Sequence, residues 1–281
     1  MATSYIQRTL LGLIIGLTGF GCGGGVGKAF RPTGDVHRFD NADWQFVLDT
    51  VVVDDGYAVR WDELKANAGG SRDALYRYVG LIGAVSPDNR PDLFPTDADR
   101  LAYWINAYNA VCMFRVLERN LPGNLIAGTA TPIPGSIYLV DQTPVGGRGM
   151  TLDGIEKDKI RSTGDPRIHF AVNCASYSCP PLRTEAYTAA RLDDQLDDQG
   201  RRYLNDPRAA RLVDDDDTVA LNSIFTEFYK GDFVTPYRET TGDKDADLLD
   251  ALRPFAASGS PVHRAARYKS MSYDWSLNRP R

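Results

Sequence analysis

The segment DPRIHFAVNCASYSCPPLR, residues 165–183, concentrates side chains that can take part in chemistry. It contains His169 and two cysteines, Cys174 and Cys179, with serines between the cysteines. A thiolate, an imidazole and hydroxyl donors are the groups that enzymes use to attack an amide or ester carbonyl. The same two cysteines can instead form a disulfide in an exported protein. The segment therefore raises two hypotheses, an active site and a cross-linked corner of the fold.

In the catalytic hypothesis, Cys174 is the nucleophile and a histidine is the base that activates it. A cysteine in this role needs a lowered thiol pKa and partial exposure. His169 is the nearest histidine in the sequence, and the other two are His37 and His263. If His169 is itself catalytic, its partners are the side chains that cover its face of the fold.

Other polar side chains are candidates for supporting roles. Asn106 or Asn109 would orient the catalytic base, and the alternative is that both are core amides that tie a helix to a neighbouring strand. Ser176 would donate a hydrogen bond to a developing oxyanion, or it caps the turn between the cysteines. Arg183 would bind an anionic group of a ligand through its guanidinium, or it pairs with the acidic side chains of the surface.

The elements that carry these residues decide which of them can act together. Apolar and other residues alternate along residues 167–173, which predicts a β-strand that ends at the cysteines. Five strand residues at ~3.3 Å each would place His169 and Cys174 roughly 16 Å apart, on opposite faces of the strand. A nucleophile and its base must approach to ~3 Å. We therefore expect this pair not to act together unless the chain bends sharply at Asn173.

Cysteine usage supports the cross-linked alternative. Cys112 lies among apolar residues and is expected to be a small buried hydrophobe, and Cys22 is expected to be lipidated or removed. The remaining pair, Cys174 and Cys179, has four residues between its members, enough for a turn that brings the two Cα atoms within ~4.4–6.8 Å. A metal site that uses these cysteines with His169 lacks the close spacing of zinc ligands and a second histidine nearby, so we expect none.

The clearest predicted element is a long helix at about residues 96–119. Thr96 and Asp99 have the spacing of a capping box at its start. Its apolar side chains spread over nearly every face, which is typical of a helix that is buried on nearly every side. Asn106 and Asn109 lie within it, and each amide needs partners because an unpaired buried amide costs ~1–3 kcal/mol.

The rest of the chain is also predicted to be mostly helical. Further helices are expected at residues 42–52, at 72–84 after a cap at Ser71, at 154–161 after caps at Asp153 and Glu156, near 192–204, and at 221–233 with an end at Gly231. Strands are expected at both ends of residues 136–152, around a glycine turn, and near residues 268–275. Because helices outnumber strands without regular alternation, the predicted class is α+β, a helix-rich single domain around a small sheet.

The N-terminus has the pattern of a targeting segment. Arg8 precedes an apolar run at residues 9–20. A membrane-spanning helix needs ~20 apolar residues, so this shorter run predicts a signal peptide over residues 1–21.

Cys22 follows directly and is similar to the lipid-attachment cysteine of bacterial lipoproteins. Residues 22–40 are rich in glycine and predict a flexible linker, and residues 41–281 form the domain. We therefore expect a protein of the bacterial cell envelope, a periplasm-facing lipoprotein or a secreted protein, that contacts the membrane only through its lipid anchor.

Composition and motifs restrict the binding partners. The 281-residue chain carries a net charge of −5, and it offers no basic stripe for nucleic acid. Two glycine-rich matches to nucleotide-binding motifs occur at residues 19–29, but they precede the domain and lack required positions. We expect no cofactor and no nucleic acid; the expected ligand is a small molecule or a peptide, and the sequence identifies no partner protein.

Five segments in order resemble the successive signatures of the domain-of-unknown-function family 547. These segments are RLAYWINAYNA, DGIEKDKIR, DPRIHFAVNCASYSCPPLR, IFTEFYKGDF and YDWSLN. The resemblance runs from about Ala42 to Asn278, and Phe228 stands where the family often has tryptophan. It implies a shared fold and bacterial relatives that are often exported, and it implies no established reaction.

Two functional hypotheses follow from the residues. The first is a thiol- or histidine-assisted hydrolase or transferase that acts on an amide or ester. The second is a non-catalytic binding or scaffolding module of the envelope, with a corner fixed by a disulfide between Cys174 and Cys179. The state of these two sulfur atoms separates the hypotheses, because a sulfur in a disulfide is not a thiolate.

Overall fold

The computed structural model describes residues 36–126, 136–213 and 217–281. The predicted signal peptide, Cys22 and most of the predicted linker lie outside the described residues. The helices are α2 (Ala42–Val51), α3 (Trp61–Lys65), α4 (Ser71–Ala84), α5 (Asp97–Glu118), α6 (Ser136–Leu139), α7 (Leu152–Ile155), α8 (Ile168–Ala171), α9 (Leu192–Leu204), α10 (Lys230–Thr241), α11 (Leu248–Leu252) and α12 (Pro261–Arg264), with π-helices η4 (Glu156–Ile160) and η7 (Ile224–Phe228). The short 3-10 turns are η1 (Asp54–Gly56), η2 (Ala68–Gly70), η3 (Pro91–Leu93), η5 (Arg161–Thr163), η6 (Ala189–Arg191) and η8 (Arg253–Phe255). The strands are β1 (Val52–Val53), β2 (Ala58–Val59), β3 (Thr143–Val145), β4 (Arg148–Met150), β5 (Ala210–Val213), β6 (Thr218–Asn222) and β7 (Arg267–Met271).

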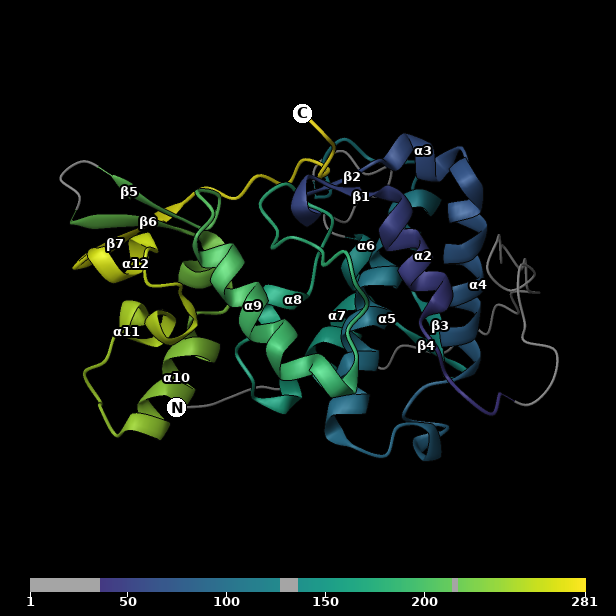
Figure 1. Cartoon of the computed structure of the whole chain (residues 1–281), viewed down its shortest axis with the longest axis horizontal. Helices are drawn as coiled ribbons and strands as arrows, with labels where there is room; N and C mark the ends of the chain where they lie inside the picture. Colours follow the sequence, from purple (N-terminus) through teal and green to yellow (C-terminus); the bar gives the residue numbers. More distant parts are fainter. Residues whose placement is uncertain (1–35, 127–135, 214–216) are drawn as a thin grey trace, which may run out of the picture.

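The long helix α5 is the centre of the larger of two hydrophobic cores, which we call the main core. Nearly every residue from Leu101 to Leu117 is buried, and α4, α7 and η4 pack against the helix, while α2 packs against α4 (Figure 1). The capping box of Thr96 and Asp99 is present, because the Asp99 N–H donates to Thr96 Oγ1 at 3.1 Å and the Thr96 N–H donates to Asp99 Oδ2. The predicted buried central helix is therefore confirmed, and so is the helix-rich α+β class.

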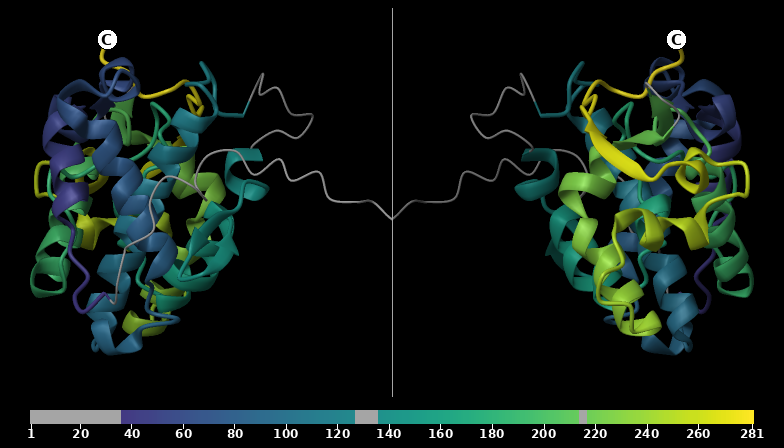
Figure 2. Two further views of the ribbon diagram at one scale, coloured as in Figure 1. Left: turned by 90° about the vertical axis from the view of Figure 1, so that its right-hand side faces the viewer. Right: turned by 90° about the vertical axis from the view of Figure 1, so that its left-hand side faces the viewer.

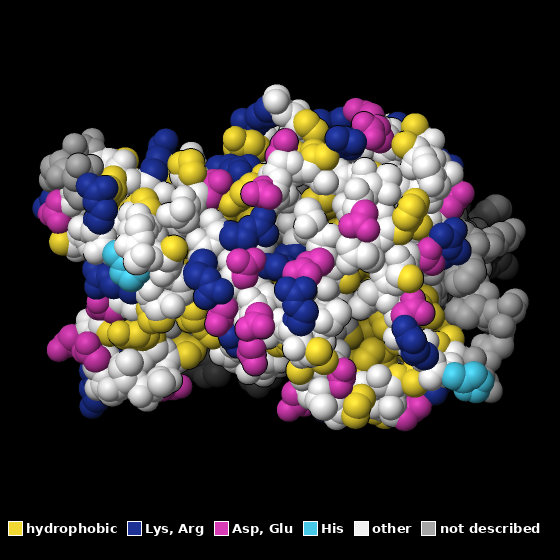
Figure 3. Space-filling model, in the orientation of Figure 1, with side chains coloured by type: hydrophobic (Ala, Val, Ile, Leu, Met, Phe, Trp, Pro, Cys, Tyr) yellow, Lys and Arg dark blue, Asp and Glu magenta, His cyan; other side chains and the backbone are white. Residues whose placement is uncertain are grey.

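A second core lies at the other end of the molecule, around α9, α10, α11 and a three-stranded sheet (Figure 2). In this sheet β5 and β6 are antiparallel, whereas β6 and β7 are parallel. The hairpins β1–β2 and β3–β4 are separate two-stranded sheets, and both pack into the main core. On the face drawn in Figure 3, positive and negative side chains are interspersed over both ends of the molecule.

The two cores meet at α8, where the structure contradicts the sequence prediction. Residues 168–171 form a single helical turn in place of the predicted strand, and the chain becomes extended only at Val172. The Asp165 and Pro166 carbonyls accept the first turn's hydrogen bonds, and all four residues of α8 are buried. Phe170 packs into the second core, and its neighbours Ile168 and Ala171 pack into the main core. A turn that is buried on all sides gives no helical period, so alternation alone suggested a strand.

Four other local predictions were wrong. The first part of residues 136–152 forms the short helix α6, and only the later part forms the predicted strands, as the hairpin β3–β4. Gly231 lies within α10, which continues to Thr241. At the start of α7 the capping oxygen belongs to Thr151, which accepts from the Gly154 N–H. Ser71 is the first residue of α4 and makes no capping bond with its side chain.

Candidate functional site

A cavity of about 160 Å³ lies where the two cores meet. Helices α5 and α6, the segment that contains α8 and the C-terminal segment all contribute to its wall. Its lining residues are Tyr108, Tyr138, Asp153, Glu156, His169, Val172, Cys174, Cys179, Pro180, Ile224, Phe228, Tyr229, Tyr273 and Trp275. The wall is therefore mainly aromatic, with one imidazole, two carboxylates and two sulfur atoms.

His169 is the central polar group of this wall. Its side chain is only 1% exposed, and its ring stacks on Tyr229 with centroids 3.9 Å apart. Its Nε2 atom lies 2.8 Å from Asp232 Oδ2. An ionised carboxylate only accepts hydrogen bonds, so Nε2 carries the proton and Nδ1 of the neutral ring has a free lone pair. Nδ1 has no hydrogen-bond partner within the described part of the chain.

Asp232 holds this tautomer in place. The hydrogen bond from His169, followed by the bond from Arg161, holds the pKa of Asp232 well below its usual range. Arg161 donates to Asp232 through Nε at 2.8 Å and Nη2 at 3.0 Å. Its guanidinium also lies over the ring of Tyr229, 5.2 Å from the centroid. The imidazole is therefore fixed both by its stacked ring and by an anchored carboxylate.

A second hydrogen-bonded pair lines the same cavity. The hydroxyl of Tyr229 donates to Glu156 Oε1 at 2.6 Å. Burial, followed by the nearby charge of Glu156, raises the pKa of Tyr229 well above its usual value. The phenol therefore stays protonated at neutral pH and remains a hydrogen-bond donor on the cavity wall.

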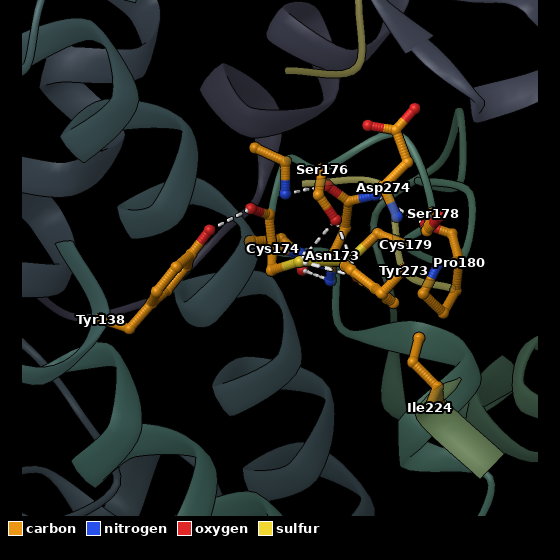
Figure 4. Close-up of a disulfide and its surroundings, with 12 residues drawn as sticks. Tyr138, Asn173, Cys174, Ser176, Ser178, Cys179, Pro180, Ile224, Tyr273 and Asp274 are labelled. Carbon is orange, nitrogen blue, oxygen red and sulfur yellow. Dashed lines mark hydrogen bonds between the residues drawn. A yellow bond between two sulfur atoms is a disulfide. The ribbon is translucent and has the colours of Figure 1, made fainter. Parts of the chain in front are cut away.

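Cys174 and Cys179 form a disulfide at the edge of the cavity (Figure 4). Their Cα atoms are 6.2 Å apart, which lies within the usual range for disulfides. The hydroxyl of Tyr273 lies 3.3 Å from each sulfur atom and 2.7 Å from Ser176 Oγ. The hydroxyl of Tyr138 donates to the Cys174 carbonyl at 2.7 Å. The predicted corner is therefore cross-linked, and tyrosines surround it.

The C-terminal segment 273–278 closes this side of the site. It pairs with the disulfide loop, because the Tyr177 N–H donates to the Ser276 carbonyl at 2.7 Å and the Asn278 N–H donates to the Ala175 carbonyl at 3.0 Å. The Asn278 side chain also accepts a hydrogen bond from Trp61 at 3.0 Å. The segment thus links the disulfide loop to the N-terminal part of the main core, while Tyr273 and Trp275 reach the cavity.

The structure corrects the predicted separation of His169 and Cys174. Both residues line the same cavity, whereas the strand prediction placed them on opposite faces. The reason is that the chain turns through α8 and becomes extended only at Val172, so side chains five apart need not alternate. The other two histidines, His37 and His263, are exposed and do not line the cavity.

Asn106 and Asn109 are bound within the core and do not line the cavity. Asn106 exchanges two hydrogen bonds with the backbone of Tyr187, at 2.8 and 3.0 Å. Asn109 donates to the Ala171 carbonyl at 3.0 Å and accepts from the Asn173 N–H at 2.8 Å. Both match the core-amide alternative, and Asn109 also fixes the backbone between His169 and the disulfide.

The other predicted candidates lie around the site without lining it. Ser176 is 1% exposed, and its hydroxyl also lies 3.1 Å from Cys174 Sγ. Arg183 donates to Asp198 and Glu185, both at 2.6 Å, which is the predicted pairing with acidic side chains. Cys112 is a buried free cysteine, and burial raises its thiol pKa well above the usual value.

Sequence reasoning missed Asp232, Glu156, Tyr229 and Tyr273 as parts of one site. Asp232 is 63 positions from His169 in the sequence, so no local spacing joins them. A signal in the sequence is that these residues fall in DGIEKDKIR, IFTEFYKGDF and YDWSLN, which resemble family signatures as the histidine segment does. Those segments resembled a family without assigning a role to any residue.

In residues 36–126, 136–213 and 217–281, no group of three or more His, Cys, Asp or Glu side chains is placed to hold a metal ion. The same ranges contain no helix that is long and apolar enough to cross a membrane.

Comparison with known proteins places part of the chain in a family. Residues 94–204 match the model of the protein family of unknown function DUF547. The comparisons with curated proteins and with solved structures gave no significant match. The matched range contains α5, His169 and both disulfide cysteines, whereas Asp232 and Tyr273 lie beyond it. Over residues 94–204, this chain therefore resembles the DUF547 family.

Proposed function

We propose that the cavity is the active site of a histidine-assisted hydrolase or transferase that acts on an ester or amide, with His169 as general base. One observation carries the proposal: a buried imidazole lines a cavity, with Nε2 fixed on Asp232 and Nδ1 unpartnered among the described residues. An imidazole in this tautomer can accept a proton at Nδ1, and positioned general bases contribute typically ~10²–10⁴-fold to rate.

The reaction follows from this geometry. Nδ1 of His169 takes a proton from a water molecule, or from the hydroxyl or amine of an acceptor, as its oxygen or nitrogen bonds to the carbonyl carbon. Asp232 stabilises the imidazolium that forms, because its carboxylate lies 2.8 Å from Nε2. The tetrahedral intermediate then expels the leaving group, which receives the proton from Nδ1. The hydroxyl of Tyr229 donates its hydrogen bond to Glu156, so its oxygen remains as an acceptor for a polar group of the substrate.

The cavity restricts the substrate. An engineered cavity of ~150 Å³ holds one benzene molecule, so a cavity of about 160 Å³ accepts one small apolar group. Tyr138, Phe228 and Trp275 offer aromatic surface for such a group. We therefore propose an ester or amide of a short aliphatic or aromatic acid, whose remaining part extends out of the cavity.

Water replaces Cys174 as the nucleophile in this proposal. Cys174 lies in the disulfide, and a disulfide sulfur has no thiolate to attack a carbonyl. In reduced protein, we propose that Cys174 is the nucleophile and His169 its base, because both residues line one cavity.

The competing proposal is a non-catalytic binding module of the envelope. The disulfide favours it, because a cross-linked corner gives the cavity a fixed wall without any need for turnover. The two proposals differ in what happens to a bound ester: the enzyme releases the acid, and the binding module leaves the ester intact.

The test measures hydrolysis of chromogenic esters and anilides of short aliphatic and aromatic acids by the full chain, without reductant. We expect His169→Gln to lower kcat/KM by about 10²-fold or more. His263→Gln is the matched control, because His263 is exposed and lies outside the cavity. Hydrolysis that is equal in both variants, or absent in wild type while these esters still bind, contradicts the enzyme proposal.

Location is a separate proposal that rests on the N-terminal sequence. We propose that the protein is exported and anchored through a lipid on Cys22, with the domain on the periplasmic side. Metabolic labelling with a fatty acid, with Cys22→Ala as the control, tests the anchor. Label that persists in the variant would contradict attachment at this residue.

A further inference from the structure

We propose that Cys174 and Cys179 form a redox-active disulfide that exchanges with a thiol compound at the mouth of the cavity. This activity goes beyond the proposed hydrolysis and does not depend on it. The proposal rests on three features of the corner: unequal exposure of the two sulfurs, donors placed on the sulfur that would leave, and a backbone held without the cross-link.

The two cysteines differ in access. Cys174 is half-buried, whereas Cys179 is only 5% exposed. An incoming thiolate must reach the sulfur it attacks, and exchange rates depend on which sulfur is accessible. Cys174 is therefore the sulfur that is attacked, and Cys179 is the sulfur that leaves.

The leaving sulfur has hydrogen-bond donors in place. The Cys174 N–H donates to Cys179 Sγ at 2.9 Å (Figure 4). The Tyr273 hydroxyl lies 3.3 Å from both sulfurs, so it can donate to Cys179 Sγ when negative charge develops there. Burial of Tyr273 raises its pKa well above the usual value, so its hydroxyl keeps its proton at neutral pH. Donors to a thiolate favour the charged form, and a thiol that forms a stable thiolate leaves faster.

The corner keeps its shape by other means than the disulfide. Its backbone is bonded to the C-terminal segment through Tyr177 and Asn278, and the Asp274 N–H donates to Ser178 Oγ at 2.9 Å. Ala175 has a φ of 64°, a conformation that L-residues rarely adopt, and its N–H donates to Asn173 Oδ1 at 2.8 Å. These bonds remain after reduction, so the two thiols stay close enough to close again.

The exchange balances as a two-electron transfer from a dithiol. A thiolate of the dithiol attacks Cys174 Sγ, a mixed disulfide forms, the bond to Cys179 breaks, and its electron pair stays on Cys179 as thiolate. The second thiolate of the dithiol then attacks the dithiol's first sulfur, which is bonded to Cys174 in the mixed disulfide. Cys174 leaves as thiolate. The dithiol is oxidised to a disulfide, and the two cysteines take up its two protons. The reverse sequence oxidises a dithiol.

The first test traps the mixed disulfide in full-length variants that keep one cysteine of the Cys174–Cys179 pair. Cys179→Ser leaves Cys174 free, and Cys174→Ser leaves Cys179 free. With glutathione disulfide as probe, intact mass should show one glutathionyl group on Cys174 at least about tenfold faster than on Cys179, because Cys174 is more exposed. Both variants also carry Cys22→Ala, so that this thiol does not react. Cys112 is present in both variants and should stay unmodified, since it is buried. Equal rates in the two variants would overturn the proposal.

The second test uses wild-type cysteines and measures the rate at which dithiothreitol opens the disulfide in folded protein. Tyr273→Phe removes the donor to sulfur, so the rate should fall about tenfold. Tyr203→Phe is the matched control, because Tyr203 donates to the Ser178 carbonyl of the same loop at 2.8 Å without contacting sulfur. A Tyr273→Phe rate equal to that of the control, or a disulfide that opens only when the protein unfolds, would also overturn the proposal.

Failure of this proposal is distinguishable from failure of the proposed hydrolysis. Exchange is measured without an ester substrate, and hydrolysis is measured without reductant on the bridged protein. A disulfide that does not exchange therefore leaves hydrolysis by His169 standing, and an inactive His169 leaves the exchange standing.

Discussion

The buried amides of α5 and the buried histidine of the cavity wall differ in their hydrogen-bond partners. Along α5, Asn106 and Asn109 use both their oxygen and their nitrogen in hydrogen bonds to buried backbone. On the cavity wall, His169 binds through Nε2, while Nδ1 has no partner in the described residues. All three side chains are at least 96% buried.

This difference separates groups that hold the fold from groups that are free to act. A buried amide with every partner in place stabilises the packing around it, and removal of one such partner costs the desolvation of the group left behind. A buried base with one unpartnered nitrogen contributes less to stability through that atom. The nitrogen keeps a lone pair for a ligand. Burial and residue type alone therefore do not identify a site. Among the described residues with a buried, unpartnered side-chain atom, His169 is the one that lines this cavity.

Replacement of the α5 amides should have the largest effect on stability, and it tests whether these amides hold the fold. Asn106→Leu leaves the Tyr187 N–H and carbonyl without these partners, so the free energy of unfolding should fall by about 3 kcal/mol or more. Asn109→Leu should cost a similar amount, and it should also impair the cavity because it frees the backbone at Ala171 and Asn173. Urea denaturation measures both changes. A loss below about 1 kcal/mol in each variant would mean that these amides are not structural.

Removal of the disulfide should have the next largest effect on stability. The loop between Cys174 and Cys179 is short, so chain entropy predicts a loss of about 2 kcal/mol for the double serine variant. Denaturation of the variant beside wild type, both without reductant, measures it. A cost of 5 kcal/mol or global unfolding would show that the cross-link, and not the C-terminal segment, holds the corner.

Replacement of the base should change stability least among the buried groups. In His169→Gln the new amide can still donate to Asp232, and Nδ1 had no partner to lose, so we expect a change of about 1 kcal/mol or less. Loss of ester hydrolysis by the same variant, in the assay described above, would separate the catalytic role of His169 from a structural role. A loss of stability as large as that of Asn106→Leu would place His169 among the structural groups.

The pH dependence of stability should reveal the smallest effect, at Asp232. Its pKa is lowered on folding, so its contribution is present above the ordinary value of 3.8 and fades as the pH falls below that value. Asp232→Asn should therefore be slightly less stable than wild type near neutral pH, and the difference should shrink at acid pH. Asp194→Asn, on the exposed face of α9, is the control. Curves that stay parallel down to the lowest accessible pH would contradict the assignment.

Several features of the fold were predictable because they depend on local pattern. The capping box of Thr96 and Asp99 and the apolar faces of residues 96–119 predicted a buried helix, and this is confirmed. The pairing of Cys174 with Cys179 was one of two predicted alternatives, and it matches the structure. The family resemblance predicted for Ala42 to Asn278 is confirmed over residues 94–204.

The strand predicted at residues 167–173 failed for a physical reason. Alternation distinguishes a strand from a helix only when one face of the element meets water, and α8 is buried between two cores on all sides. The Asp165–Pro166 pair was the overlooked signal, because both residue types favour turns, and their carbonyls accept from the Ile168 and His169 N–H groups. The error also produced the mistaken separation of His169 from Cys174.

The sequence by itself determined the helical character of the chain, its buried central helix and the segment in which histidine and cysteines meet. These depend on side-chain periodicity and on residues within a few positions of each other. Only the tertiary structure decided that Asp232 fixes His169 and that Tyr273 covers the disulfide. Such pairs lie 63 and 94 or more positions apart, and the packing of two cores, which no local pattern encodes, brings them within hydrogen-bond distance.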